Sequence, residues 1–143
     1  MSKEEEYQIV TIDEPKDIPW GVIGGGISEY NEDKAGDDQG KNMCFVLKGP
    51  DEEIVGGMIG STHWDWLYVN LMWLKEEFRG QGYGHRLLMM AEEEARQRGA
   101  KYAYLDTFSF QAPAFYKKYG YEVYGELKDF PTGHQRYFLK KVL

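Results

Sequence analysis

The sequence is short of cysteine and of long apolar runs, and each shortage excludes a class of protein. Cys44 is the single cysteine among 143 residues, beside only three histidines. One cysteine cannot close an internal disulfide, and the common cysteine-based zinc sites need at least two, so no metal is expected. No apolar run approaches the roughly 20 residues of a membrane-spanning helix, so we expect no membrane partner.

Positive charge is also scarce. The chain has 17 basic and 24 acidic residues, which gives a formal net charge of −7. Nucleic-acid-binding proteins usually carry a basic face, so nucleic acid is not an expected partner. An acidic protein does tolerate a cationic partner such as an amine.

The length and the first residues bear on organisation and location. A chain of this size is expected to form one domain over residues 1–143. Its acidic start, MSKEEEY, does not resemble a secretory signal, so a cytoplasmic location is expected.

Hydrophobic periodicity predicts an alternation of strands and helices. Apolar runs and alternating patterns predict strands at 7–12, 43–48, 54–64, 66–74, 101–108, 121–127 and 135–142. Helical spacing predicts helices at 18–30, 85–98 and 114–120, with a polar loop at 31–41. The succession of strand 66–74, helix and strand 101–108 predicts a βαβ unit with parallel strands. The predicted fold class is therefore α/β (α+β), a mixed sheet with helices.

Two finer features belong to these elements. In the helix at 85–98, Leu87, Leu88, Ala91 and Ala95 form the expected apolar face, and the glutamates at 92–94 are expected to point outward. In the strand at 54–64, glycines such as Gly60 predict a bulge or a close approach of two backbones.

Two glycine clusters could hold a ligand. FRGQGYGHRLL, residues 78–88, lies between a strand and the start of a helix, where free backbone N–H groups attract phosphate. Glycine allows the turn, and Arg79 can pair with phosphate oxygens. The second cluster, GVIGGG at 21–26, has neither a preceding strand nor a basic neighbour, so we interpret it as part of a helix. The first cluster is therefore the predicted anion site.

Neither common nucleotide-binding loop fits this site. The dinucleotide fingerprint is G-x-G-x-x-G directly after a strand, whereas here the glycines alternate at 80, 82 and 84 behind KEEFR. Asp106 lies about twenty residues on, where that fingerprint has its ribose ligand, but the glycine spacing still argues against it. A P-loop needs G-K-[ST], and here His85 follows Gly84.

RGQGYG does match R-x-x-G-x-G, the pyrophosphate-binding motif of the GNAT acetyltransferases, through Arg79, Gly82 and Gly84. Downstream, APAFYKKYGY resembles the FYxxxGF-type signature of that family, and YLDTF resembles its fifth strand. The resemblance covers residues 66–124. It implies a GNAT-like fold, which is a mostly antiparallel sheet with a central parallel βαβ unit, flanked by helices.

The same resemblance implies that acetyl-CoA is the co-substrate and lies between strands 66–74 and 101–108. The backbone of residues 80–85 would hold the pyrophosphate, and the pantetheine arm would pair with the strand near residues 72–74. A backbone N–H near Leu74 could polarise the thioester carbonyl. The expected cofactor-binding residues are Met72, Trp73, Leu74, Arg79, Gly80, Gln81, Gly82, Tyr83, Gly84, His85, Ser109 and Tyr116.

Tyr116 matches the family tyrosine that commonly protonates the departing thiolate. A phenol with a pKa near ~10 suits a thiolate of similar basicity, although core packing also explains an aromatic side chain in this helix. Many relatives have an asparagine seven residues before this tyrosine. Here Ser109 occupies that position with Gln111 nearby, and either side chain could bond to the pantetheine.

The general base is less defined by the sequence. Candidates are His63, Asp65, Asn70 acting through an ordered water, and His134, and each could equally be a structural polar residue. We retain His134 as the catalytic base candidate, because its loop could border the acceptor site. No nucleophile elbow is present, which predicts direct transfer without an acyl-enzyme.

The expected function is an acetyl-CoA-dependent N-acetyltransferase acting on a primary amine of a small molecule. Two alternatives remain open. The acceptor could be a protein N-terminus or a lysine side chain, or the chain could be a CoA-binding module without activity. A homodimer is common in the resembled family and is carried here as an open expectation.

Overall fold

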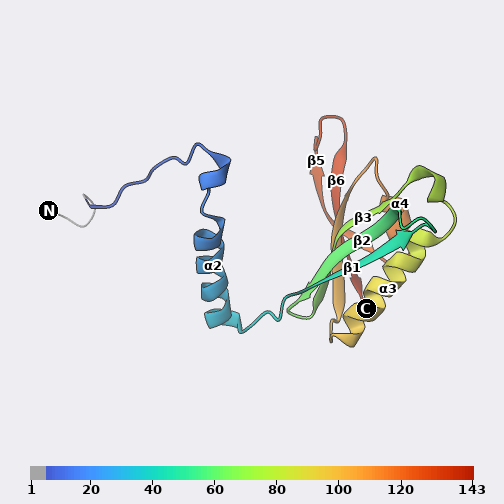
Figure 1. Cartoon of the computed structure of the whole chain (residues 1–143), viewed down its shortest axis with the longest axis horizontal. Coiled ribbons are helices and arrows are strands. Elements are labelled where there is room, and N and C mark those ends of the chain that lie inside the picture. The colour runs from blue at the N-terminus through green and yellow to red at the C-terminus, as the bar shows by residue number, and fades with distance from the viewer. Residues whose placement is uncertain (1–5) are drawn as a thin grey trace. The chain divides into compact units, whose positions relative to one another are not determined.

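The computed structural model describes residues 6–143 (Figure 1). The residues up to Asp37 and those from Asp38 onward form two compact units, and each unit is described by itself. The expectation of one domain over the whole chain remains a prediction.

The N-terminal unit contains a short 3₁₀ helix, η1 (Pro15–Asp17), and a long helix, α2 (Trp20–Ala35). The helix predicted at 18–30 is confirmed, but it continues through the first five residues of the predicted loop. Helix-compatible residues of NEDKA and a lysine in the last turn allow this extension. Gly36, with φ of 84°, ends the helix.

The strand predicted at 7–12 is wrong. This segment has no regular structure, and all six of its residues are exposed. A strand is stabilised by hydrogen bonds to a neighbouring strand, and no described strand pairs with this segment. The alternation in YQIVTI therefore reflects composition without a pairing partner.

The C-terminal unit contains a six-stranded sheet in the order β1-β2-β3-β4-β6-β5. Every neighbouring pair is antiparallel except β3 with β4, so the predicted mixed, mostly antiparallel sheet with one parallel pair is confirmed. The strands are β1 (Lys41–Lys48), β2 (Ile54–His63), β3 (Trp66–Leu74), β4 (Tyr102–Phe108), β5 (Glu122–Lys128) and β6 (Gln135–Val142). The remaining elements are η2 (Glu76–Phe78), α3 (Tyr83–Gln97) and α4 (Pro113–Lys118).

Helix α3 packs its predicted apolar face against β1, β2 and β3. Leu87, Leu88, Ala91 and Ala95 are all buried, as their helical spacing predicts. Glu92 does not point outward as expected, because it is fully buried. Its carboxylate accepts hydrogen bonds from the Tyr121 hydroxyl at 3.0 Å and from Lys141 Nζ at 2.7 Å, which compensate its burial.

The two parallel strands are paired only along a short stretch. The register joins 66–68 of β3 to 102–104 of β4 and goes no further. On its other side β3 is paired with β2 along its whole length, apart from an irregularity where Ile59 faces Leu71 and Gly60 faces Val69. Asn70 is the extra residue of this bulge. A Cβ at Gly60 would lie 2.5 Å from the Tyr68 carbonyl oxygen, so the predicted close backbone approach is confirmed.

Candidate active site

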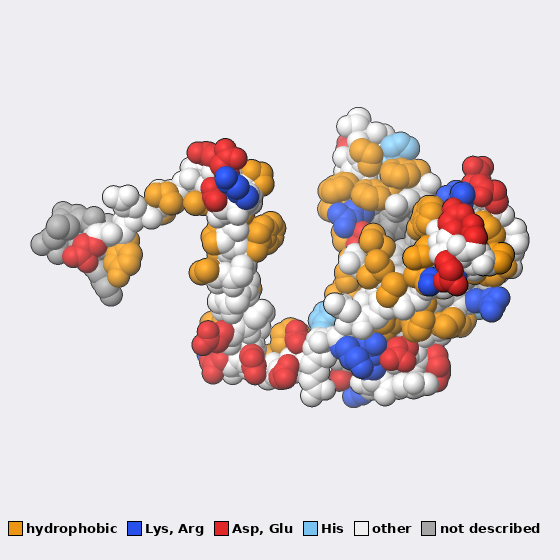
Figure 2. Space-filling model, viewed as in Figure 1, with side chains coloured by type: hydrophobic (Ala, Val, Ile, Leu, Met, Phe, Trp, Pro, Cys, Tyr) orange, Lys and Arg blue, Asp and Glu red, His pale blue; other side chains and the backbone are white. Residues whose placement is uncertain are grey.

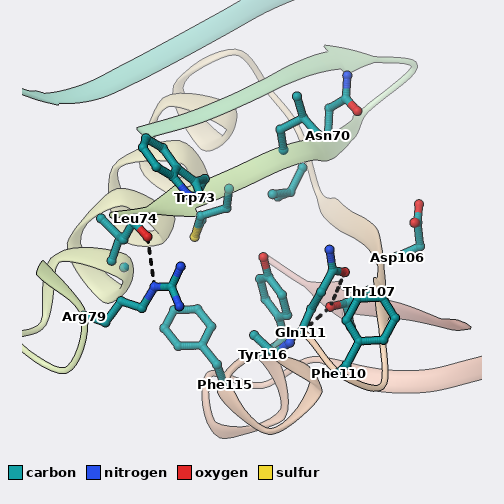
Figure 3. Close-up of a pocket in the computed structure, with 15 residues that line it drawn as sticks. Asn70, Trp73, Leu74, Arg79, Asp106, Thr107, Phe110, Gln111, Phe115 and Tyr116 are labelled. Carbon is teal, nitrogen blue, oxygen red and sulfur yellow. Dashed lines mark hydrogen bonds between the residues drawn. The ribbon is translucent and has the colours of Figure 1, made fainter. Parts of the chain in front are cut away.

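A cavity of about 470 Å³ lies where β3 and β4 separate (Figure 3). Its size is within the range of small-molecule sites. Side chains alternate between the two faces of a strand, so buried Val69 and Thr107 belong to the α3 face while Asn70 and Asp106 belong to the other. The cavity therefore takes its lining from both faces of the sheet. The lining residues are Val69, Asn70, Leu71, Met72, Trp73, Leu74, Arg79, Gly84, Asp106, Thr107, Phe110, Gln111, Ala112, Phe115 and Tyr116.

The predicted anion loop lies at one end of this cavity. Arg79 Nε donates a hydrogen bond to the carbonyl oxygen of Leu74 at 2.9 Å, which fixes the loop to the end of β3. Gly80 and Gly82 have φ of 74° and 87°, a left-handed conformation that favours glycine. No side chain caps the start of α3. The first N–H groups of this helix therefore face outward without a side-chain acceptor, as an anion site requires.

Gly84 is required for a different reason. A Cβ at this position would lie 3.3 Å from the Phe115 ring and 3.7 Å from the Leu74 side chain. Glycine therefore lets the first turn of α3 pack tightly against α4 and the end of β3. Spacing alone could not separate this packing role from the turn roles of Gly80 and Gly82.

Three other predicted loop residues have local contacts. Gln81 Nε2 donates to the carbonyl oxygen of Glu77 at 2.8 Å, so this side chain closes the loop. The Tyr83 ring lies edge-on to Phe78. The His85 ring stacks on Tyr119, with centroids 4.1 Å apart. Direct contact of these side chains with phosphate remains a prediction.

Tyr116 is the most buried polar side chain of the cavity wall apart from Thr107, and its hydroxyl points into the cavity (Figure 3). Burial raises the pKa of this phenol to about 12, and the negative charge of Asp106 contributes in the same direction. The hydroxyl therefore stays protonated at neutral pH and can donate a proton or a hydrogen bond to a group in the cavity.

The turn after β4 separates the two residues considered for pantetheine binding. Ser109 Oγ accepts a hydrogen bond from the backbone N–H of Gln135 at 3.1 Å, which engages it with β6. Gln111 lines the cavity instead, with its Oε1 accepting from the backbone N–H of Phe108 at 2.8 Å and from Thr107 Oγ1 at 3.3 Å. Gln111 is therefore better placed than Ser109 to meet a ligand in the cavity.

The four base candidates lie at different distances from the site. Asn70 lines the cavity at the bulge of β3. His134 packs edge-on against Phe110, one ring behind the cavity wall, with centroids 5.0 Å apart. His63 forms a 3.3 Å hydrogen bond with the Tyr104 hydroxyl, and Asp65 lies in the β2–β3 turn with φ of 68°. Neither His63 nor Asp65 lines the cavity.

Asp106 is a charged cavity residue whose place the sequence reasoning missed, because it was weighed only as a ribose ligand. Its Oδ1 accepts a hydrogen bond from Nε of Arg136 at 3.0 Å and lies 2.8 Å from Nη2 of the same guanidinium in an ion pair. Arg136 lies 30 positions away in the chain. Only the pairing of β4 with β6 brings the two residues together, and no local pattern indicates it.

Two further observations concern the described residues, 6–143. No group of three or more potential metal-ligating side chains gathers among them. None of their helices is both long enough and apolar enough to cross a membrane.

The comparisons with known proteins agree with this geometry. Residues 9–121 match the model of the Acetyltransferase (GNAT) family. An acetyltransferase of Agrobacterium fabrum, Atu2258, is 38% identical over 112 residues, which are 78% of this chain and 82% of that protein. A blasticidin-S acetyltransferase of Streptomyces morookaense is 39% identical over 92 residues, 64% of this chain and 68% of that protein. The crystal structure of an acetyltransferase from Bacillus cereus is 34% identical and superposes with a TM-score of 0.83, covering 94% of this chain and 98% of that one.

The chain therefore belongs to the GNAT family of acetyltransferases. Enzymes of this family use acetyl-CoA and act on an acceptor. The resemblance seen in the sequence is confirmed, as is the interpretation of the chain as an acyltransferase.

Proposed function

We propose that this chain transfers the acetyl group of acetyl-CoA directly to a primary amine of a small molecule. The observation that carries the proposal is the continuous cavity at the split between β3 and β4. It joins the end of the anion loop, at Arg79 and Gly84, to the buried phenol of Tyr116 and to the polar groups of Asn70 and Asp106.

The donor end fits a CoA molecule. Gly80 and Gly82 have nothing within 4 Å of the position of a Cβ, and no side chain caps the start of α3. This leaves room for a pyrophosphate beside free N–H groups and the Arg79 guanidinium. Beyond Tyr68, β3 has no partner on its β4 side, so residues such as Met72 and Trp73 could pair with a pantetheine arm.

The residues of the cavity support direct transfer. The amine nitrogen would attack the acetyl carbon, the C–N bond would form and the C–S bond would break. An ammonium group must lose two protons in this reaction. One proton would go to solvent, and the other would restore the proton that Tyr116 gives to the sulfur. The described cavity wall contains no serine or cysteine that could carry the acetyl group.

A small acceptor is favoured over a protein by the cavity and by one relative. The cavity has a volume suited to a small molecule. The blasticidin-S acetyltransferase, 39% identical to this chain over the matched region, is named for a small-molecule acceptor. That acceptor is not assigned to this chain, but the similarity to this relative supports a small molecule as the class of acceptor.

The test is a steady-state assay of CoA release. Purified protein is offered acetyl-CoA with a panel of small primary amines, and in parallel with peptides that carry a free N-terminus or a lysine. We expect acceptor-dependent CoA release with at least one small amine and an acetylated product of matching mass. Release with peptides alone would replace the small-molecule proposal by the protein one. Binding of acetyl-CoA without release from any acceptor would contradict the proposed activity.

We also propose a homodimer, supported by the composition of α2. This helix carries large hydrophobic side chains, among them Trp20, Ile23 and Ile27. Four glycines lower its intrinsic stability, and an isolated helix of 16 residues is marginal in water. Sedimentation equilibrium tests the proposal. A dimeric mass that Ile23→Ser shifts toward the monomer is expected, whereas a monomer at all concentrations would contradict it.

A further inference from the structure

We infer that the carboxylate of Asp106 binds the ammonium group of the acceptor, which makes the acceptor a cationic amine held at the end of the cavity opposite Arg79. The inference rests on the proposed function and adds the recognition element that it leaves unassigned.

Asp106 has the right position in the cavity. In Figure 3, Arg79 lies at one end, Asp106 and Asn70 lie at the other, and the Tyr116 hydroxyl points into the space between them. Its charge acts on Tyr116, since it contributes to the raised pKa of that phenol. An ammonium bound at Asp106 would therefore lie in the same cavity as the proton donor proposed for the leaving sulfur.

The carboxylate is held in one orientation. Both contacts from Arg136 reach Oδ1, at 3.0 and 2.8 Å. The guanidinium in turn lies 5.5 Å from the Phe108 ring, 5.2 Å from Phe130 and 5.3 Å from Phe138. These rings restrict the movement of the guanidinium, so the ion pair holds the Asp106 carboxylate in place at the cavity wall.

The carboxylate retains capacity for another donor. A carboxylate offers roughly four lone-pair sites, and the two contacts from Arg136 share one oxygen. Burial, followed by the charge of Asp106, raises the pKa of the Tyr68 phenol, which keeps that hydroxyl protonated. The two contacts on Oδ1 leave room for an N–H of an ammonium group on the carboxylate.

The wall at this end suits a cation and not an anion. Asp106 lines the cavity, whereas its partner Arg136 does not. Phe110 lines the cavity beside it and stacks on Phe108 at 5.3 Å, so it presents an aromatic surface to the carbon chain of an amine or to a methylated ammonium. Hydrophobic side chains also gather over the end of this unit where β5 and β6 lie (Figure 2).

The first experiment measures binding without turnover. N,N-dimethylbutylammonium, a tertiary ammonium ion that keeps one N–H but cannot form a stable amide, is titrated by calorimetry into protein saturated with CoA. We expect Asp106→Asn to weaken binding by about tenfold or more, since it removes the charge but keeps the shape. Glu126→Gln is the matched control, because Glu126 is an exposed acid outside the cavity wall, on β5, which β6 separates from β4. Equal binding by wild type and Asp106→Asn would overturn the inference.

The second experiment separates an effect on the KM for the acceptor amine from an effect on the KM for acetyl-CoA. With an accepted amine, Asp106→Asn should raise the KM for the amine by about tenfold or more while the KM for acetyl-CoA changes by less than about twofold. Tyr68→Phe guards against a merely structural effect, because it removes a phenol whose pKa Asp106 raises and retains the charge of Asp106. It should bind the probe within about threefold of wild type. An unchanged amine KM in Asp106→Asn would overturn the inference.

The two proposals can fail separately. Acetyl transfer by wild type, with an amine KM that does not depend on Asp106, would retain the proposed function and reject the inference. Binding of N,N-dimethylbutylammonium that depends on Asp106, in a protein that releases no CoA with any amine, would retain the cation site and reject the proposed function.

Discussion

Tyr116 combines two properties at the scale of a single residue, since its ring belongs to the core and its hydroxyl reaches the cavity. The ring lies edge-on to Phe115 and to Tyr121, with centroids 5.2 and 5.9 Å away. Both interpretations of this residue in the sequence, packing and proton donation, are therefore compatible with the structure, and only a substitution that spares the ring can separate them.

Tyr116→Phe is that substitution. If the hydroxyl is the proton donor, kcat should fall by about 10²- to 10⁴-fold, the usual contribution of a positioned acid. The dissociation constant of acetyl-CoA and the melting temperature should stay close to wild type, because the ring remains. Steady-state kinetics and calorimetry measure both. Wild-type kcat in this variant would assign Tyr116 to packing alone.

The same phenol predicts a loss of stability in alkali. A tyrosine of the unfolded chain titrates near ~10, whereas burial raises the pKa of Tyr116 to about 12. Between these pH values the unfolded chain has released the proton and the folded chain has kept it. Stability therefore falls as pH rises through this window, by up to about 1.4 kcal/mol per pH unit from this group.

Urea denaturation at pH 9, 10 and 11 checks this prediction. Burial, followed by the charge of Glu92, also raises the pKa of Tyr121, and burial first of all raises the pKa values of Tyr68 and Tyr104, so wild type loses stability through these phenols as well. Tyr116→Phe should lose less stability than wild type between pH 10 and 11. Parallel curves for the two proteins would contradict the assigned cause.

Glu92 lies outside the cavity wall, and we expect its substitution to have a large effect on the free energy of unfolding. Its buried carboxylate bonds to Tyr121 and to Lys141, whose ammonium group is itself largely buried. Glu92→Ala leaves that ammonium group without its partner, so we expect a loss of about 3–5 kcal/mol in the free energy of unfolding. Glu93→Ala, one position along the same helix and exposed, should cost less than about 1 kcal/mol. Denaturant titration compares them, and equal losses would contradict the network.

Some residues of the candidate site belong to short sequence motifs, whereas others reach the site only through long-range strand pairing. Arg79, Gly82 and Tyr116 could be predicted because each belongs to a short motif with fixed spacing. Asp106 could not, because its position follows from the separation of β3 from β4. Gln111 was named from the sequence together with Ser109, but only the turn that follows β4 distinguishes the two. Strand pairing is a long-range property that periodicity does not encode.

At the scale of elements, the loop between β3 and α3 is where backbone geometry and the expected ligand meet. Gly82→Val forces a branched side chain into φ of 87° beside the uncapped start of α3. We expect the dissociation constant of CoA to rise about tenfold or more, since the N–H groups would no longer be aligned.

Gly25→Val is the control for this loop. Gly25 lies within α2 and has nothing within 4 Å of the position of a Cβ, so valine there should leave CoA affinity within about twofold of wild type. Calorimetry with CoA measures both variants, and their melting temperatures report any loss of fold. Equal effects of the two substitutions would place the donor site elsewhere.

Helices and strands with a strong hydrophobic periodicity could be predicted from the sequence. Elements whose formation depends on a neighbouring strand or on their surroundings were predicted less well. The strand at 66–74 and the helix at 85–98 are confirmed because burial of one face or of both imposes their patterns. The end of α2 was placed five residues early, since a polar helix face and a polar loop have the same composition. The strand at 7–12 was predicted wrongly, because alternation alone does not supply a neighbouring strand.

At the scale of the whole unit 38–143, Arg98 connects the end of α3 to the far edge of the sheet. Its Nη1 donates to the Lys41 carbonyl oxygen at 2.9 Å and to Thr62 Oγ1 at 3.2 Å, and its Nη2 donates to the Asn42 carbonyl oxygen at 3.1 Å. Arg98→Met should lower the free energy of unfolding by about 2–4 kcal/mol, since three acceptors lose a charged donor.

Lys101→Met provides the comparison for Arg98. Lys101 is exposed and lies 3.9 Å from Asp65, so its loss should cost less than about 1 kcal/mol. Denaturation curves of both variants and wild type measure the difference. A cost for Arg98→Met as small as that for Lys101→Met would show that α3 is held by its apolar face alone.

The cavity takes its lining from both faces of the sheet, and this has a consequence for how such an enzyme can diversify. The loop and helix residues proposed for the donor belong to the β3–α3–α4 part of the chain, whereas Asp106 and its supports belong to β4 and the β5–β6 hairpin. Variants randomised only at Asp106 and its supporting residues should therefore retain affinity for CoA while their selectivity for the amine changes. Selection could alter the acceptor end of the cavity without changing the donor end.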